Sequence, residues 1–122
     1  MTRKYNCIAW AAGDDRRWWW PTGFAFWPDG VPSTETLDAF VSAFQTLGYE
    51  VCQTGDLESG QEKIAIYTSL MGLPTHASRQ LPTGMWTSKL GPHHDIEHEL
   101  EGVSASEYGH IARFMARQAR RG

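Results

Sequence analysis

The apolar positions of the chain follow two kinds of spacing, helical toward the amino end and alternating in the middle. The clearest helical stripe consists of Leu37, Phe40, Val41, Phe44 and Leu47. Ser33 or Thr34 can cap the start of this helix, and Gly48 suits its end. A shorter helix is predicted over residues 5–12 and is closed by Gly13.

Alternating and β-branched residues predict strands in the second half of the chain. Residues 63–68 form the first candidate strand, and residues 75–81 and 85–90 form a hairpin around a turn at 82–84. Residues 108–115 could form a last strand or a helix; Gly109 fits helical spacing poorly, which favours a strand that frays into a basic tail. Two helices and a short antiparallel sheet indicate an α+β domain. A chain of 122 residues has the size of one domain, residues 1–122.

Composition narrows the class of protein. Hydrophobic residues make up 41% of the chain and the formal net charge is −3, so the chain can bury a core and lacks the basic field typical of nucleic-acid binding. No apolar stretch is as long as a membrane span, and no leader precedes a cleavage site. We expect a cytoplasmic protein, or an effector delivered without a classical signal peptide. Cys7 and Cys52 are then two reduced thiols.

Cys7 and His76 are the residues whose chemistry is best defined. Cys7 lies in the predicted first helix, and His76 opens the predicted hairpin. A neighbouring imidazole can convert a thiol into the nucleophilic thiolate, and later act as an acid. The side-chain amide of Asn6, with the Cys7 backbone N–H, could hold an oxyanion. These residues predict a cysteine hydrolase that works through an acyl-thiol intermediate, with no metal or cofactor.

A third group should orient the imidazole. The two hairpin registers place Ser78 opposite either Ser88 or Lys89. Ser88 has a compatible offset, and Asp95 has the better charge but follows a Gly-Pro turn. Lys89 is the weakest candidate because a cation cannot accept the imidazole N–H.

The Cys and His segments resemble those of a known enzyme group. Residues 6–11 resemble the start of the Cys helix in NlpC/P60 and CHAP amidases, and residues 75–77 with 84–91 resemble their His strand and the next strand. This resemblance implies a papain-like fold, in which the Cys helix and a second helix pack on a short antiparallel sheet. It also implies a peptidase or amidase with a peptide-like or protein substrate. The third residue in those groups is usually His, Asn, Gln or Glu, whereas here the offset falls on Ser88 or Lys89.

The whole chain also resembles an uncharacterised bacterial domain family. The matching segments are residues 5–11, 26–28, 47–50, 75–77, 86–91 and 95–98. This second resemblance implies no activity. A papain-like domain without catalysis, serving as a binding or immunity-type module, is therefore the alternative hypothesis.

Six tryptophans are many for this length. Trp10, Trp19, Trp20 and Trp86 could form a substrate-binding platform beside Cys7. The other interpretation is an aromatic lid that covers a small core.

Residues 94–98 suggest a third hypothesis. His94-Asp95-Ile96-Glu97-His98 matches the inverted zincin pattern H-x-x-E-H. On a helix, His94 and His98 would lie one turn apart and could share a zinc ion, with Glu97 as the base.

Overall fold

The computed structural model describes residues 3–13, 19–21, 26–91, 94–98 and 110–119, with the backbone alone for residues 3–7, 88–91 and 94–98. These ranges contain two helices and six strands. They are α1 (Arg3–Ala12), α2 (Leu37–Gln45), β1 (Glu50–Cys52), β2 (Gln61–Thr68), β3 (Pro74–Gln80), β4 (Trp86–Gly91), β5 (His94–His98) and β6 (His110–Gln118). The predicted α+β class is confirmed. No helix in the described ranges has the length and apolar run that a bilayer span requires.

α1 ends directly before the predicted Gly13, whereas α2 ends at Gln45, before the turn that contains Gly48, and starts later than expected. Gly13 and Gly48 have positive φ angles of 80° and 92°, a conformation that glycine adopts without steric cost. The N-cap of α2 is Thr36, whose hydroxyl accepts a hydrogen bond from the Ala39 N–H at 3.2 Å. The predicted cap at Ser33 or Thr34 is wrong, because the backbone is still extended at Thr36.

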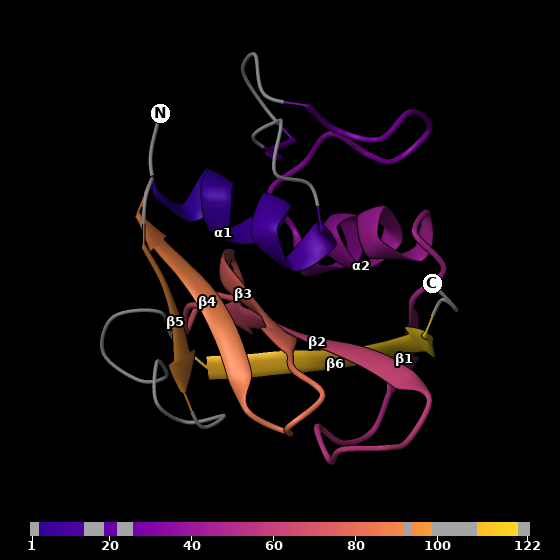
Figure 1. The fold of residues 1–122 in the computed structure, drawn as a ribbon. Coiled ribbons are helices and arrows are strands. Elements are labelled where there is room, and N and C mark those ends of the chain that lie inside the picture. Colours follow the sequence, from indigo (N-terminus) through magenta and orange to yellow (C-terminus); the bar gives the residue numbers. More distant parts are fainter. Residues whose placement is uncertain (1–2, 14–18, 22–25, 92–93, 99–109, 120–122) are drawn as a thin grey trace.

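The strands form one antiparallel sheet in the order β1-β6-β2-β3-β4-β5 (Figure 1). β6 confirms the predicted last strand and pairs with β2 from the Gln61–Gln118 pair to the Thr68–His110 pair. The short edge strand β1 pairs with the other side of β6 and was not predicted. β6 therefore lies inside the sheet although it is the last described strand.

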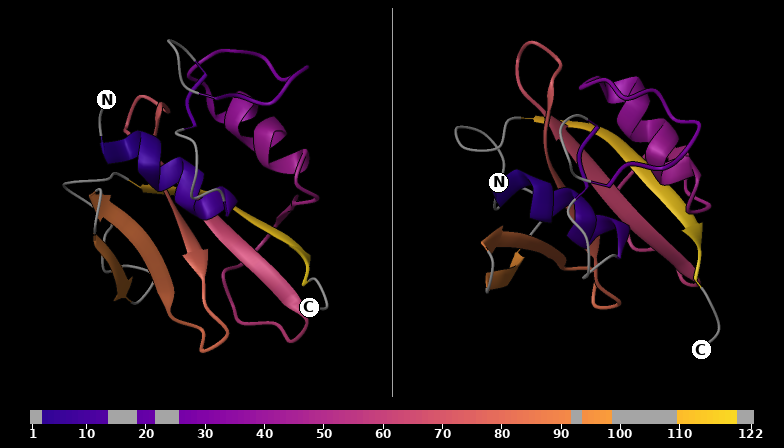
Figure 2. Two further views of the ribbon diagram at one scale, coloured as in Figure 1. Left: turned by 45° about the horizontal axis from the view of Figure 1, so that its top comes forward. Right: turned by 90° about the horizontal axis from the view of Figure 1, so that it is seen from above.

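Both helices lie on one face of the sheet, here called the helix face (Figures 1 and 2). Side chains from this face and from the helices form the main core. Its largest members are Ile8, Trp19, Trp20, Phe40, Phe44, Tyr49, Ile64, Ile66 and Met115. Alternate residues of β2 point to the opposite face, because successive side chains of a strand alternate.

The opposite face, here called the far face, carries a second cluster of Ala65, Tyr67 and Trp86, with Phe114 packed against it. The rings of Trp86 and Phe114 lie 6.2 Å apart although β2 and β3 separate β4 from β6. A flat sheet would hold two such strands about 14 Å apart. The sheet therefore curves toward its far face.

Candidate functional site

The two elements that carry the predicted catalytic pair are neighbours in space. α1, which contains Asn6 and Cys7, packs against β3, which contains His76, and against β4 (Figure 1). The Arg79 guanidinium of β3 lies 5.0 Å from the centre of the Trp10 ring of α1, within the range of a cation–π contact. This contact holds α1 on β3. Trp10 and Arg79 each follow a member of the predicted pair, Cys7 and His76, by three residues.

The buried residues of α1 show which side of this helix packs against the sheet. Ile8, Ala9 and Ala11 are buried in the main core together with Ala77 of β3. Position 7 precedes Trp10 and Ala11 by three and four residues, which is the spacing of neighbours on one side of a helix. The side chains of Asn6 and Cys7 lie outside the described part of the structure.

His76 is completely buried in the first half of β3. It pairs with Tyr67 of β2, and the two rings meet edge to face with centres 5.2 Å apart. The hydroxyl of Ser78, also fully buried, donates a hydrogen bond to the Tyr67 hydroxyl oxygen at 3.5 Å. The imidazole therefore lies in a small buried cluster of an aromatic ring and hydroxyl groups.

This cluster belongs to the far face of the sheet. His76 and Ser78 pair with Tyr67 and Ala65, which are members of the far-face core, whereas Ala77 between them packs with α1. The described pairs between β3 and β4 are Arg79–Thr87 and Gln80–Trp86, next to the hairpin turn. Beyond these pairs the two strands diverge, and α1 packs against both (Figure 2).

The two candidates for the orienting group lie on different strands. Two registers of β3 and β4 were expected. The structure has the one in which Ser78 is level with Ser88. Ser88 is on β4, next to the strand of His76, whereas Asp95 is on the edge strand β5, where it pairs with Lys89. Because β4 lies between β3 and β5 in the sheet, the strand order places Ser88 nearer to β3 than Asp95. Both side chains lie outside the described part.

Three of the four tryptophans predicted to bind substrate are core residues. Trp19, Trp20 and Trp86 expose 3%, 2% and 2% of their surface. The Trp20 ring packs edge-on against Phe40 of α2, with centres 5.3 Å apart, and Trp86 belongs to the far-face cluster. Such side chains present almost no surface to a ligand, so they fit the interpretation of an aromatic cover over the core. Trp10 is half-buried beside Arg79.

The zinc hypothesis at residues 94–98 was based on a helix that the structure does not contain. This segment is the strand β5, paired with β4, and not a helix. The backbone of a strand rises about 3.3 Å per residue, so residues 94 and 98 are separated by about 13 Å. On a helix the same two positions would be only about 6 Å apart, which is the spacing that the inverted zincin pattern presumes. The residues with described side chains hold no cluster of three potential metal ligands.

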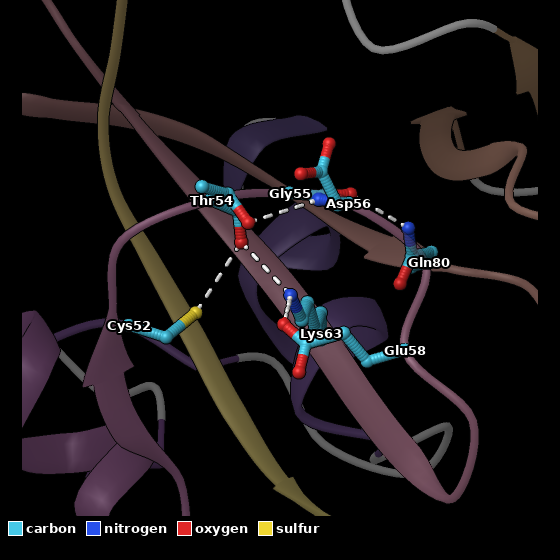
Figure 3. A network of polar contacts seen from close by, with 7 residues as sticks. All are labelled: Cys52, Thr54, Gly55, Asp56, Glu58, Lys63 and Gln80. Carbon is cyan, nitrogen blue, oxygen red and sulfur yellow. Dashed lines mark hydrogen bonds and ion pairs between the residues drawn. The ribbon is translucent and has the colours of Figure 1, made fainter.

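Lys63 is a buried polar residue that the sequence did not single out. Its side chain is fully buried, and its ammonium donates to the Thr54 carbonyl oxygen at 3.1 Å and to a Glu58 carboxylate oxygen at 2.5 Å. The Cys52 thiol donates to the same Thr54 oxygen at 3.4 Å (Figure 3). The side-chain N–H of Gln80 donates a hydrogen bond to the carbonyl oxygen of the next residue, Gly55, at 2.8 Å. These contacts anchor the loop before β2 over the far face.

Comparison with known proteins gives a family but no activity. A family model described as Domain of unknown function (DUF7689) matches residues 1–116. No curated protein and no solved structure matches the chain.

Proposed function

We propose that this chain, which belongs to the family DUF7689, is a papain-like cysteine hydrolase that cleaves an amide or ester bond. One observation carries the proposal: the helix that contains Cys7 packs directly on the strand that contains a fully buried His76. A thiol becomes an efficient nucleophile when an imidazole beside it can take its proton.

The reaction follows from these roles. His76 removes the thiol proton, and the Cys7 sulfur forms a bond to the carbonyl carbon of the substrate. The Cys7 N–H and the Asn6 amide stabilise the oxyanion. The imidazolium then gives its proton to the leaving amine or alcohol as the scissile bond breaks. Water, deprotonated by His76, attacks the acyl-thiol, releases the acid and restores the thiol.

The seam between β3 and β4 is the place where the pair would meet. α1 covers the helix face, whereas His76 shares the far face with Tyr67. The two strands diverge beyond the Arg79–Thr87 pair, and α1 packs against both. A thiol on α1 would reach the imidazole through this seam. The hydroxyl of Ser88, on the adjacent strand, would orient the ring.

A second candidate function is supported by the same burial. His76 exposes no surface, so in this structure it offers the leaving group of a substrate no direct access. A papain-like module that binds a protein partner without hydrolysis is consistent with a sealed imidazole. The two functions differ in the reactivity of Cys7.

Alkylation by iodoacetamide, followed by mass spectrometry, separates the two functions. We expect Cys7 to react at least about tenfold faster than Cys52 at pH 7, because an ordinary thiol of pKa near 8.5 is only a few per cent thiolate there. Cys52, half-buried and bonded to the Thr54 oxygen, is the internal control. His76→Gln should slow the labelling of Cys7 and leave that of Cys52 unchanged.

A pH profile of the wild-type chain guards against a misfolded variant. The labelling of a thiol activated by His76 should continue below pH 7, where an ordinary thiol slows about tenfold for each pH unit. Equal and slow labelling of the two cysteines across the profile would contradict catalysis and favour the binding module.

A further inference from the structure

Arg79 carries a charge that no described residue pairs with. Its guanidinium stacks on the Trp10 ring, with 5.0 Å between the guanidinium carbon and the ring centre. Among the described residues, the Arg79 side chain makes no hydrogen bond and no ion pair. A guanidinium has five N–H donors, and a cation–π contact occupies its flat face but not these donors. The donors of Arg79 are therefore available to a ligand.

Arg117 shows how a stacked arginine is bonded when its role is structural. Its guanidinium carbon lies 4.4 Å from the centre of the Tyr49 ring. Its Nε–H donates to a Glu62 carboxylate oxygen at 3.0 Å, and its Nη1–H donates to the Leu47 carbonyl oxygen at 2.8 Å. These bonds join β6 to β2 and to the segment after α2. Arg79 has the same aromatic support without such bonds in the described part of the chain.

The guanidinium of Arg79 lies at the carboxyl end of α1. The Gly13 N–H donates to the Trp10 carbonyl oxygen at 3.0 Å and closes the helix, and a Cβ atom at Gly13 would lie 3.7 Å from Arg79 Nη1. A helix end of this kind carries roughly half a negative charge, which holds the cation in place and neutralises only part of it. Arg79 and Trp10 are both partly exposed, so a molecule in solution can reach them.

This charge is close to the proposed catalytic pair. Trp10 follows Cys7 by one helical turn, and side chains so related have Cβ atoms about 5–6 Å apart. Arg79 follows His76 on the same strand, β3. The guanidinium is thus on the order of 10 Å from position 7, a distance that about three residues of an extended peptide span.

We propose that Arg79, supported by Trp10, binds a carboxylate of the substrate. A planar guanidinium matches a carboxylate with two parallel hydrogen bonds, which a neutral amide cannot accept in the same way. The inference rests on the proposed hydrolase function and gives its substrate class. That class is a peptide with an acidic side chain or a free carboxyl end within about three residues of the cleaved bond. Arg79 then determines specificity and takes no part in proton transfer.

NMR titration of the isotope-labelled wild-type chain tests the binding without any catalysis. The probes are acetyl-Gly-Glu-amide, acetyl-Gly-Gln with a free carboxyl end, and acetyl-Gly-Gln-amide, which has no carboxylate. The side-chain N–H signals of Arg79 and Trp10 should shift with the two charged probes. The uncharged probe should bind about tenfold more weakly, because charge-assisted hydrogen bonds are about twice as strong as neutral ones. The two charged probes show whether a side chain or a carboxyl end is the preferred source.

Substitutions at position 79 assign the preference to the guanidinium. Arg79→Gln should remove the preference for a carboxylate. Arg79→Lys should keep only part of it, because an ammonium has the charge but not the planar fork. Arg117→Gln is the matched control, since it also removes an arginine stacked on an aromatic ring, and it should leave the preference unchanged. Circular dichroism should confirm that the variants fold.

Iodoacetyl probes then test whether the bound carboxylate lies beside Cys7. Iodoacetyl-Gly-Glu-amide should alkylate Cys7 about tenfold faster than iodoacetyl-Gly-Gln-amide does, and the two should label Cys52 at the same rate. Where iodoacetamide labels Cys7 rapidly, equal rates with the two probes overturn the inference. Equal affinities for the three dipeptides, a preference that survives in Arg79→Gln, or tighter binding of inorganic phosphate than of either carboxylate overturn it in every case.

Failure of the proposed function gives a different result. Cys7 then reacts with iodoacetamide as slowly as Cys52 does, while the wild-type chain still prefers the charged dipeptides and Arg79→Gln does not. That combination contradicts the hydrolase and leaves Arg79 as the carboxylate site of a binding module.

Discussion

The two faces of the sheet are both buried, but with different chemistry. The helix face is closed by apolar side chains such as Ile64, Ile66 and Met115. The far face buries Lys63, His76 and Ser78 as completely as its apolar neighbours. A buried polar group costs free energy unless its hydrogen bonds are satisfied, and Lys63 and Ser78 both have partners, so the stability of the far face depends on these bonds whereas that of the helix face depends on apolar packing. The far face is therefore where a chemical role is to be sought, and His76 lies there.

The largest effect should come from the helix face. Phe44→Ala removes a fully buried ring that packs edge-on against Tyr49, with centres 6.0 Å apart. We expect the free energy of unfolding to fall by about 3–5 kcal/mol, because a cavity remains where the ring was. Urea denaturation measures this change. Leu70→Ala is the control at an exposed site and should change stability by less than about 0.5 kcal/mol. Similar losses in the two variants would show that the Phe44 ring contributes no more to stability than an exposed side chain.

A smaller loss should follow from crowding the far face. A Cβ atom at Gly55 would lie 2.7 Å from Phe114 Cε1 and 3.1 Å from Trp86 Cζ2. We expect Gly55→Ala to reduce stability by about 1–3 kcal/mol, as overpacking usually does. Thermal unfolding of Gly55→Ala and of Gly55→Ala/Phe114→Leu tests the cause. The smaller side chain at position 114 should recover part of the loss, and no recovery would show that the loop is held in another way.

The smallest change in stability should come from the ion pair of Lys63. Two variants separate the contribution of the lysine charge from that of its buried volume. Glu58→Gln removes the carboxylate partner of a buried ammonium and should cost about 1–2 kcal/mol, a value discounted because Glu58 is half-exposed. Glu58→Gln/Lys63→Met removes both charges and should be more stable than Glu58→Gln alone. Chemical denaturation at neutral pH compares the two. If the double variant is the less stable, the ammonium contributes through its bond to the Thr54 oxygen and not as half of an ion pair.

Periodic patterns predicted the helices and the long strands. The stripe around Phe40 and Phe44 predicted α2, and the alternation of residues 63–68 predicted most of β2. β1 has only three residues, too few to show a period, and is formed by pairing with β6. Hydroxyl residues stand at positions 33, 34 and 36, so composition could not decide which of them caps α2.

The candidate site was less predictable because it depends on tertiary contacts. The spacing of residues 94–98 fits a helix, but pairing with β4 makes the segment a strand. Adjacent tryptophans reveal little about which of them is buried, and Trp19 and Trp20 both lie in the core. Lys63 alternates with Ala65 and Tyr67, and this period was the signal that could have placed the lysine on the far face.

The position of β6 between β1 and β2 has a consequence for how the chain folds during synthesis. Residues 110–118 leave the ribosome after all the other described strands, yet β1 contacts the sheet through them. Until they emerge, β2 has an open hydrogen-bonding edge and β1 has nothing to pair with. Folding of this sheet is therefore dominated by contacts that are distant in sequence, which slow the search for the native state and leave the nascent strands in need of protection from aggregation.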